Sequence, residues 1–203
     1  MEFEFLPAEA EETGLNPVNY QYFNQLFNHR TIILNREIDE SVIESVYLPL
    51  KDFENDGSND PITLILNSTG GSVSDGFFLA HYLTHYSKEL NIIVTGCAAS
   101  MAAVILCGGA HNPKVHRKAY PSTYGLIHDG YITLSTNESK TASDIMAFND
   151  KVDNQIRDFI LKNSNITSEQ YDSQTRHQWF LTAEEMKELN LIDEIIGSDE
   201  NVD

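Results

Sequence analysis

The sequence predicts one α/β domain in which strands alternate with helices around a parallel sheet. The chain has 203 residues, of which 41% are hydrophobic, enough for one well-cored domain and too few to favour two. Apolar β-branched runs at 62–66 and 91–95 are each followed by a helical pattern. Strands that alternate with helices of this length are typical of βαβ units and a parallel sheet.

The N-terminal part is expected to hold an acidic arm and three short elements. Residues 1–18 mix prolines and a glycine with acidic residues, a composition poorly suited to regular structure. Closely spaced aromatic residues predict a short amphipathic helix over 20–27. A strand is expected at 31–34 and a helix over 39–53, where apolar residues recur at helical spacing. The polar segment 55–61 is expected to be a loop.

The middle of the chain is expected to form strands whose ends carry glycine, serine or histidine. The predicted order is strand 62–66, a turn at Gly70-Gly71, helix 74–87, strand 91–95, a tight turn at 96–99, helix 100–108, a loop around Pro113, and strand 124–127 ending at His128. Sheets of this class carry their functional side chains at the carboxyl ends of the strands. The strand ends are therefore where a site is expected.

The longest helical pattern covers residues 143–163, after a Ser- and Thr-rich segment at 131–142 in which one hairpin-like strand is expected at most. Its broad apolar stripe fits two arrangements equally: a helix that projects and packs on a partner subunit, or an ordinary core helix. Residues 182–185 have the spacing of a capping box, which marks a helix start. A last strand is expected at 191–196, followed by an acidic tail at 198–203.

Composition and charge exclude several classes of function. A net charge of −18 argues against nucleic-acid binding, which relies on Lys and Arg to neutralise phosphates. The chain lacks the run of about 18 apolar residues that a membrane span needs, and its acidic start is unlike a signal peptide. Two cysteines, Cys97 and Cys107, indicate neither a disulfide framework nor a zinc site. We therefore expect a protein of the reducing cytoplasm.

Ser100 is the candidate nucleophile. It would lie at the first turn of a helix that directly follows a strand, where small neighbours leave its hydroxyl uncovered and the helix N-terminus favours a developing anion. Serine is also a common helix N-cap, and the segment alone supports both interpretations equally. Cys97 is a rival nucleophile or a small buried residue, and the second is favoured.

The glycine pair Gly70-Gly71 strengthens the catalytic interpretation. Two consecutive glycines allow backbone torsions that other residues avoid and let a ligand approach the main chain; a plain tight turn is the alternative. Extended backbone next to Ser72-Val73 is expected to pair with a substrate peptide as an added strand, which makes Gly70, Ser72 and Val73 the candidate substrate-binding residues.

Among the seven histidines, His128 is the candidate general base. It ends an apolar strand, where α/β sheets carry their chemistry, and it could take the serine proton. A lone histidine at a strand end is more often structural, and only the presence of Ser100 reverses that preference. His81 and His85 have metal-ligand spacing but lack the glutamate of the zinc-protease motif, so no metal site is expected.

From about residue 20 to residue 196 the chain resembles the proteolytic subunit of the Clp protease, ClpP, a family of serine peptidases with the crotonase-like superfold. The segments that carry the resemblance are Arg30–Leu34, Asn67–Val73, Gly96–Met101, Ile127-His128 and Phe180–Glu185. The resemblance implies a repeated βαβ core in a peptidase domain at 19–197, with a projecting handle helix at about 131–163.

The resemblance also implies roles and partners. Ser100 would be the nucleophile, His128 the general base, and the N–H groups of Gly71 and Met101 the oxyanion hole, with no cofactor. Chains of this family stack as two seven-membered rings around a chamber, joined by the helix 143–163. The implied partners are unfolded polypeptide substrates, further copies of the chain or other ClpP-like subunits in mixed rings, and an ATP-driven unfoldase of the Clp type.

Some positions depart from the family pattern. Gln178 stands where the family places the triad aspartate, and its amide can accept a hydrogen bond but carries no charge. Asp172 and Asp129 are candidates to replace that aspartate in space. Three extra residues lie in the loop 110–120, and the acidic arm differs from the usual pore loop. A divergent copy encoded by a plastid or a virus would explain this pattern, and would place the protein in a plastid stroma or a host cytoplasm.

These observations leave three hypotheses for function. The first is a serine endopeptidase of the ClpP type with reduced or assembly-dependent activity. The second, motivated by Gln178, is a catalytically weak ring subunit that scaffolds or regulates active partners. The third is a crotonase-type acyl-CoA enzyme, because one fold hosts both activities, although that chemistry needs no serine facing a histidine.

Overall fold

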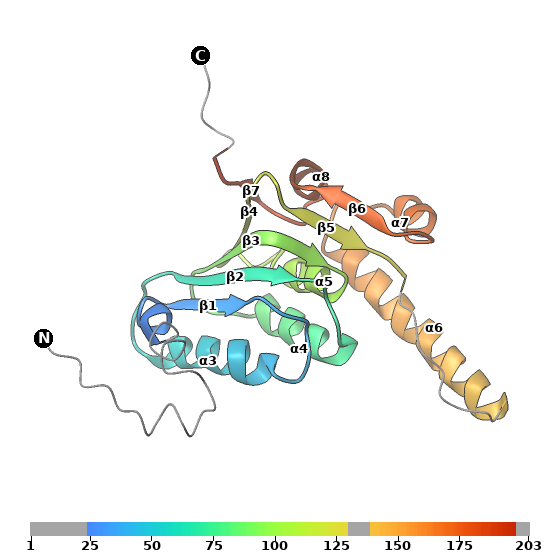
Figure 1. Cartoon of the computed structure of the whole chain (residues 1–203), viewed down its shortest axis with the longest axis horizontal. Helices are drawn as coiled ribbons and strands as arrows, with labels where there is room; N and C mark the ends of the chain where they lie inside the picture. Colours follow the sequence, from blue (N-terminus) through green and yellow to red (C-terminus); the bar gives the residue numbers. More distant parts are fainter. Residues whose placement is uncertain (1–23, 130–138, 198–203) are drawn as a thin grey trace, which may run out of the picture.

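The computed structural model describes residues 24–129 and 139–197 (Figure 1). The acidic arm expected at 1–18, most of the Ser- and Thr-rich segment 131–142, and the acidic tail at 198–203 lie outside the described residues. Within the described ranges the chain has a mixed α/β fold with a parallel sheet. The predicted fold class is confirmed.

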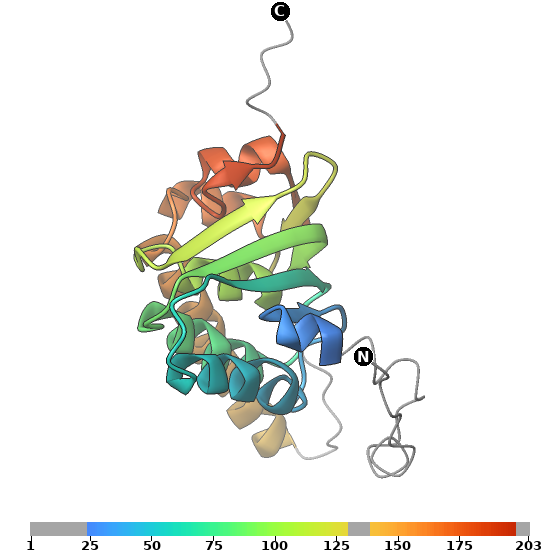
Figure 2. The ribbon, with the colours of Figure 1, turned by 90° about the vertical axis from the view of Figure 1, so that its left-hand side faces the viewer.

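In the described residues, seven strands form one sheet. Their bounds are β1 Thr31–Leu34, β2 Ile62–Ser68, β3 Leu90–Ala99, β4 Val115–Ala119, β5 Tyr124–Ile127, β6 Trp179–Thr182 and β7 Glu194–Ile195. Strands β1, β2, β3, β4 and β7 pair in parallel in that order. The C-terminal part of β3 pairs with β5, which pairs antiparallel with β6. Figure 2 shows β6 and the C-terminal helices at the end of the sheet opposite the N-terminal elements.

The helices of the described residues largely follow the predicted order. Their bounds are η1 Ile43–Tyr47, which is a π-helical turn, α3 Leu48–Asn55, α4 Val73–Thr84, α5 Met101–Gly108, α6 Ser139–Lys162, α7 Ser168–Gln174 and α8 Ala183–Glu188. A further short helix covers 24–28. The capping box expected at 182–185 is confirmed at the start of α8.

The helix expected over 39–53 begins later than predicted, at the π turn η1. Pro49 gives a physical reason for the wide turn. Proline has no N–H for the α-helical bond to the carbonyl of Ser45, and its ring would press on that carbonyl. In the structure Leu48 donates its N–H to Ile43, five residues earlier, which is the π-helical spacing.

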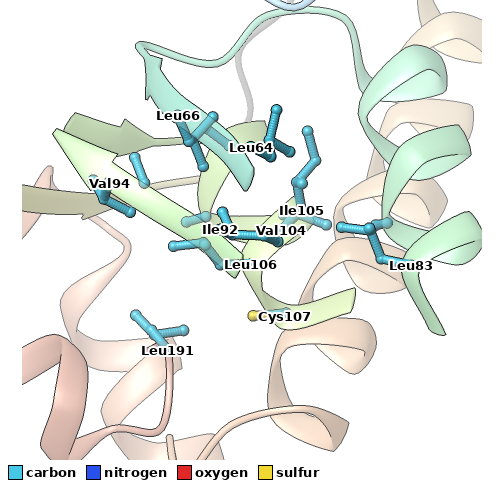
Figure 3. Close-up of a cluster of buried hydrophobic side chains, with 14 of the residues drawn as sticks. Leu64, Leu66, Leu83, Ile92, Val94, Val104, Ile105, Leu106, Cys107 and Leu191 are labelled. Atoms are coloured by element: carbon cyan, nitrogen blue, oxygen red, sulfur yellow. The ribbon is translucent and has the colours of Figure 1, made fainter. Parts of the chain in front are cut away.

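The core lies between the sheet and α5. All eight residues of α5 are buried, as expected for a helix that is apolar on every side. Leu64, Leu66, Ile92 and Val94 of β2 and β3 are almost fully buried and meet the side chains of α5 (Figure 3). Burying each such side chain stabilises the fold by about 1.5–3 kcal/mol. This packing holds the ends of β2 and β3 and the start of α5, where the candidate site lies.

Helix α6 lies in two environments. Its C-terminal half packs on the core next to α5, with Ile160 buried and Ile156 and Phe159 partly buried. Its N-terminal half runs away from the sheet (Figure 1) and leaves Met146 and Phe148 55% and 67% exposed. The core-helix interpretation therefore holds for the C-terminal half, and the N-terminal half projects as the other interpretation expects, while its packing on a partner subunit stays a prediction. In residues 24–129 and 139–197, no helix combines the length and the apolar character needed to cross a bilayer.

Three elements were not predicted: β4, β6 and α7. Strand β4 looks polar in sequence, but its Arg117 is buried because its guanidinium and N–H bind Asp193. Helix α7 starts with a capping box formed by Thr167 and Gln170, a signal that was present in the sequence. The turn predicted at 96–99 is wrong, since all four residues continue β3 and the last three of them pair with β5.

Glu54 joins α3 to α4 and the loop that follows it. Its carboxylate accepts hydrogen bonds from Lys51 at 2.8 Å, Tyr82 at 2.8 Å and Ser87 at 2.7 Å. Burial alone would raise the pKa of Glu54, but these hydrogen bonds outweigh it and lower the pKa from about 4.5 to about 2. The stabilisation is therefore complete above pH 4.5 and is lost as the pH falls towards 2.

Glu54→Gln is expected to lower the free energy of unfolding by about 1–2 kcal/mol at pH 7, because it removes the charged acceptor of these bonds. The difference from wild type should shrink as the pH falls below 4.5. Urea unfolding at a series of pH values measures both effects. Glu44→Gln, at an exposed glutamate of η1, is the matched control and should change stability by less than about 0.5 kcal/mol. Equal losses in the two variants would contradict this account.

Candidate active site

One cavity brings together most of the residues that the sequence singled out. It has a volume of about 450 Å³ and lies at the carboxyl ends of parallel strands, where sheets of this class hold their sites. The predicted residues that line it are Gly70, Gly71, Val73, Ser100, Met101 and His128, and its other lining residues are Glu37, Thr69, Val104, Ile127, Ile156 and Ile160. Ser72 and Gln178 lie outside this lining.

Ser100 forms a sharp elbow between β3 and α5. Its φ of 54° and ψ of −122° place it in a backbone region that non-glycine residues rarely adopt. Its N–H donates to the carbonyl of Leu126 at 2.7 Å, which ties the elbow to β5. Ser100 does occupy the N-cap position of α5, but its side chain makes no capping hydrogen bond to the helix, so the hydroxyl is not used as a cap. The structure instead resembles a nucleophile elbow, in which a strained strand-to-helix turn presents a hydroxyl.

Gly70 packs directly against this elbow. Its φ is 95°, and a Cβ atom built on it would lie 2.6 Å from Cβ of Ser100 and 2.7 Å from the carbonyl oxygen of Ala99. Real Cβ atoms essentially never come this close, so only glycine fits. The plain tight turn is therefore an incomplete description of Gly70. The glycine also allows the main chain to approach the candidate nucleophile closely.

Gly71 pairs with Ile38 through a parallel bridge. The bridge uses the flanking groups: Ile38 donates to the carbonyl of Gly70 and accepts from the N–H of Ser72, both at 2.8 Å. In parallel pairing the N–H of the central residue points to the other side of the strand. Neither the Gly71 N–H nor the Met101 N–H at the start of α5 has a hydrogen-bond acceptor within the described ranges. These two donors can therefore serve an anion in the cavity.

His128 directly follows β5 and reaches the same cavity. Its Nδ1 lies 2.6 Å from the main-chain carbonyl oxygen of Asp129. The antiparallel pairing of Ile127 with Trp179 places Gln178 across from His128 at the end of the ladder. Gln178 is exposed there. The register therefore brings the backbone of residue 178, the position expected for the third triad residue, towards that of the histidine.

Of the two aspartates considered as replacements, Asp172 is bound elsewhere. Its carboxylate accepts two hydrogen bonds from Arg157, at 2.7 and 2.9 Å, and this contact lowers the pKa of Asp172. Asp129 is adjacent to His128, and its main-chain carbonyl oxygen meets the imidazole at Nδ1.

Cys97 and Cys107 are both buried. The thiol of Cys97 contacts the carbonyl oxygen of Ser68 at 3.4 Å, and Cys97 is outside the lining of the cavity. Burial raises the pKa of Cys107 to about 12. The interpretation of Cys97 as a small buried residue is confirmed, which leaves Ser100 as the nucleophile candidate.

The wall that α6 contributes to the cavity was missed by sequence reasoning. Ile156 and Ile160 lie one turn apart and line the cavity together with the elbow residues Ser100 and Met101. Their four-residue spacing within the apolar stripe was the available signal. This spacing indicates that one face of the helix points into the protein, but it does not indicate which residues that face contacts.

A comparison with protein-family models matches residues 14–199 to the model of the Clp protease. The match covers most of the chain and includes every residue of the cavity described above.

Proposed function

The chain belongs to the Clp protease family, and from this premise we propose that it is a serine endopeptidase that cleaves unfolded polypeptides through an acyl-enzyme on Ser100. One observation carries the proposal: Ser100, His128 and the N–H-bearing residues Gly71 and Met101 line a single cavity. Nucleophile, base and anion donors are the three parts that acyl transfer to serine needs.

The proposed chemistry proceeds in two halves. His128 takes the hydroxyl proton of Ser100 as the oxygen attacks the peptide carbonyl, and the N–H groups of Gly71 and Met101 hold the resulting oxyanion. The imidazolium then gives its proton to the leaving amine, which leaves an ester on Ser100. Water activated by the same imidazole hydrolyses that ester and restores the serine.

The substrate is proposed to bind as an added strand. Ile38 occupies one side of the Gly70–Ser72 segment, and the other side faces the elbow and the cavity. A peptide that pairs with this side must be extended. Unfolded chains are therefore proposed as substrates, and stably folded proteins are expected to resist cleavage.

The assembly is proposed to be two stacked seven-membered rings, with an unfoldase of the Clp type delivering substrate. The exposed apolar residues Ile145, Met146 and Phe148 on the projecting half of α6 support contact with another subunit, because large exposed apolar patches mark interaction surfaces. Mixed rings with other ClpP-like subunits would use the same surface.

A second candidate function is a catalytically weak ring subunit that scaffolds or regulates active ones. Gln178 favours it, because an amide next to His128 cannot offset the charge of the imidazolium. In trypsin, the change of the triad aspartate to its amide lowers kcat about 10⁴-fold. The acyl-CoA hypothesis has no comparable support, since the matching family is a protease family.

Incubation of the purified full chain with unstructured casein tests the proposal. We expect peptide products by mass spectrometry, no cleavage of a stably folded protein of similar length, and an assembled species of fourteen subunits by native mass spectrometry. Rings that form but leave casein intact would contradict the peptidase proposal and favour the scaffold function.

A further inference from the structure

The imidazole of His128 has a hydrogen-bond partner on the main chain. Its Nδ1 lies 2.6 Å from the carbonyl oxygen of Asp129. In a Ser-His-Asp triad a carboxylate accepts the Nδ1 proton, and here a glutamine stands at that position. Resting on the proposed function, we infer that the carbonyl group of Asp129, and not the side chain of Gln178, positions His128 as the general base.

The carbonyl selects one tautomer of the ring. A carbonyl oxygen carries no proton and can only accept, so the hydrogen bond requires a proton on Nδ1. The neutral ring then has its lone pair on Nε2, which is the form that can take a proton from serine. The amide of Gln178 has both a donor and an acceptor and can bind either tautomer. The main-chain carbonyl is therefore the more selective partner.

Helix α7 holds this carbonyl in place. The N–H of Asp129 donates to the carbonyl oxygen of Thr175 at 3.2 Å. Thr175 is only 3% exposed, and its hydroxyl donates to the carbonyl of Tyr171 at 2.8 Å. The buried end of α7 therefore anchors the residue whose carbonyl orients the imidazole. Asp129 acts through His128 as a positioning residue.

Nitrogen NMR of the His128 ring tests the inference without any need for activity. The full chain carrying Ser100→Ala is used at a pH where the ring is neutral, and long-range proton–nitrogen spectra show which ring nitrogen bears the proton. Free histidine in water favours the proton on Nε2, so a ring protonated on Nδ1 is a distinctive result. We expect the proton on Nδ1, both in this chain and after the further change Gln178→Ala. A ring that returns to the Nε2-protonated form after Gln178→Ala would overturn the inference.

Two further variants separate the carbonyl of Asp129 from its carboxylate. Asp129→Asn removes the charge and keeps the carbonyl, and the Nδ1 proton should remain. Replacement of residue 130 by glycolic acid turns the 129–130 amide into an ester, whose carbonyl is a weaker acceptor. The ester should lower the Nδ1-protonated population and, with Ser100 intact, lower kcat about tenfold. An unchanged population in the ester, or loss of the Nδ1 proton in Asp129→Asn, would overturn the inference.

Failure of the proposed function gives a different pattern. A chain that cleaves no casein in any assembled form, but keeps the Nδ1 proton in all variants except the ester, would remove the peptidase proposal. The same pattern would leave the role of the Asp129 carbonyl in orienting His128 supported.

Discussion

Ser100→Ala is expected to lower kcat for casein cleavage by at least ~10⁴-fold, since removal of one triad member from a serine protease lowers kcat by ~10⁴- to 10⁶-fold. Only the attacking hydroxyl is lost, because alanine can adopt the same backbone at the elbow. The hydroxyl makes no capping hydrogen bond, so the midpoint of thermal unfolding should stay within about 1–2 °C of wild type. Initial rates of casein turnover, measured beside thermal unfolding, test both parts.

Ser122→Ala is the matched control, since Ser122 is exposed and lies outside the cavity. It should change neither rate nor stability. A Ser100→Ala variant that cleaves casein as fast as the control would remove Ser100 as the nucleophile. A large loss of stability together with activity would instead show that the hydroxyl supports the elbow.

Gly70→Ala is expected to have the second largest effect. The added methyl group would lie 2.6 Å from Cβ of Ser100 and 2.7 Å from the carbonyl oxygen of Ala99, so the elbow must shift. A displacement of about 1 Å can lower a catalytic rate 10²-fold, and overpacking of this kind costs about 1–3 kcal/mol of stability. We therefore expect a folded, destabilised chain with at least ~10²-fold lower kcat. Casein turnover and urea unfolding measure the two effects.

Gly57→Ala separates crowding from backbone strain. Gly57 also has a positive φ, 78°, but a Cβ atom there would meet nothing within 4 Å. Its substitution should cost about 1 kcal/mol through strain alone and leave the rate unchanged. Equal effects of the two substitutions on rate and stability would contradict the proposed contact between Gly70 and the elbow.

The strands that position the site could be predicted because they are locally apolar. Residues 62–66 and 91–95 show their burial in their own composition, and the structure confirms both. Strand β4 could not be recognised in this way. Its Arg117 can be buried because Asn190 and Asp193, 73 and 76 residues later, accept its hydrogen bonds, and a local pattern contains no sign of such partners.

The error at 96–99 has a similar cause. Glycine and alanine suggested a turn, but they serve close packing between strands. A Cβ atom at Gly96 would collide with the side chain of Asn67, whose oxygen accepts the N–H of Cys97 at 2.9 Å. Cys97 and the two alanines that follow it pair with β5. Small residues indicate that another segment of the chain packs closely against them, and only the folded structure shows which segment that is.

In the candidate site, too, the part that depends on local sequence could be predicted and the part that depends on tertiary contacts could not. Side-chain chemistry at strand ends was sufficient to single out Ser100 and His128, and the structure places both in one cavity. The carbonyl of Asp129 could not be found, because every residue carries such a group and only the tertiary structure selects one. Gln178 departs from the family pattern of side chains, yet the structure places a main-chain group at Nδ1 of the histidine.

Reaction with a fluorophosphonate tests most directly whether the hydroxyl of Ser100 is activated by His128. The full chain is treated with the probe, digested, and the modified residue is located by tandem mass spectrometry, with His128→Ala as the control. We expect one adduct on Ser100 and labelling at least ~10²-fold slower in His128→Ala. An adduct on another residue, or equally fast labelling of Ser100 without the imidazole, would contradict this expectation.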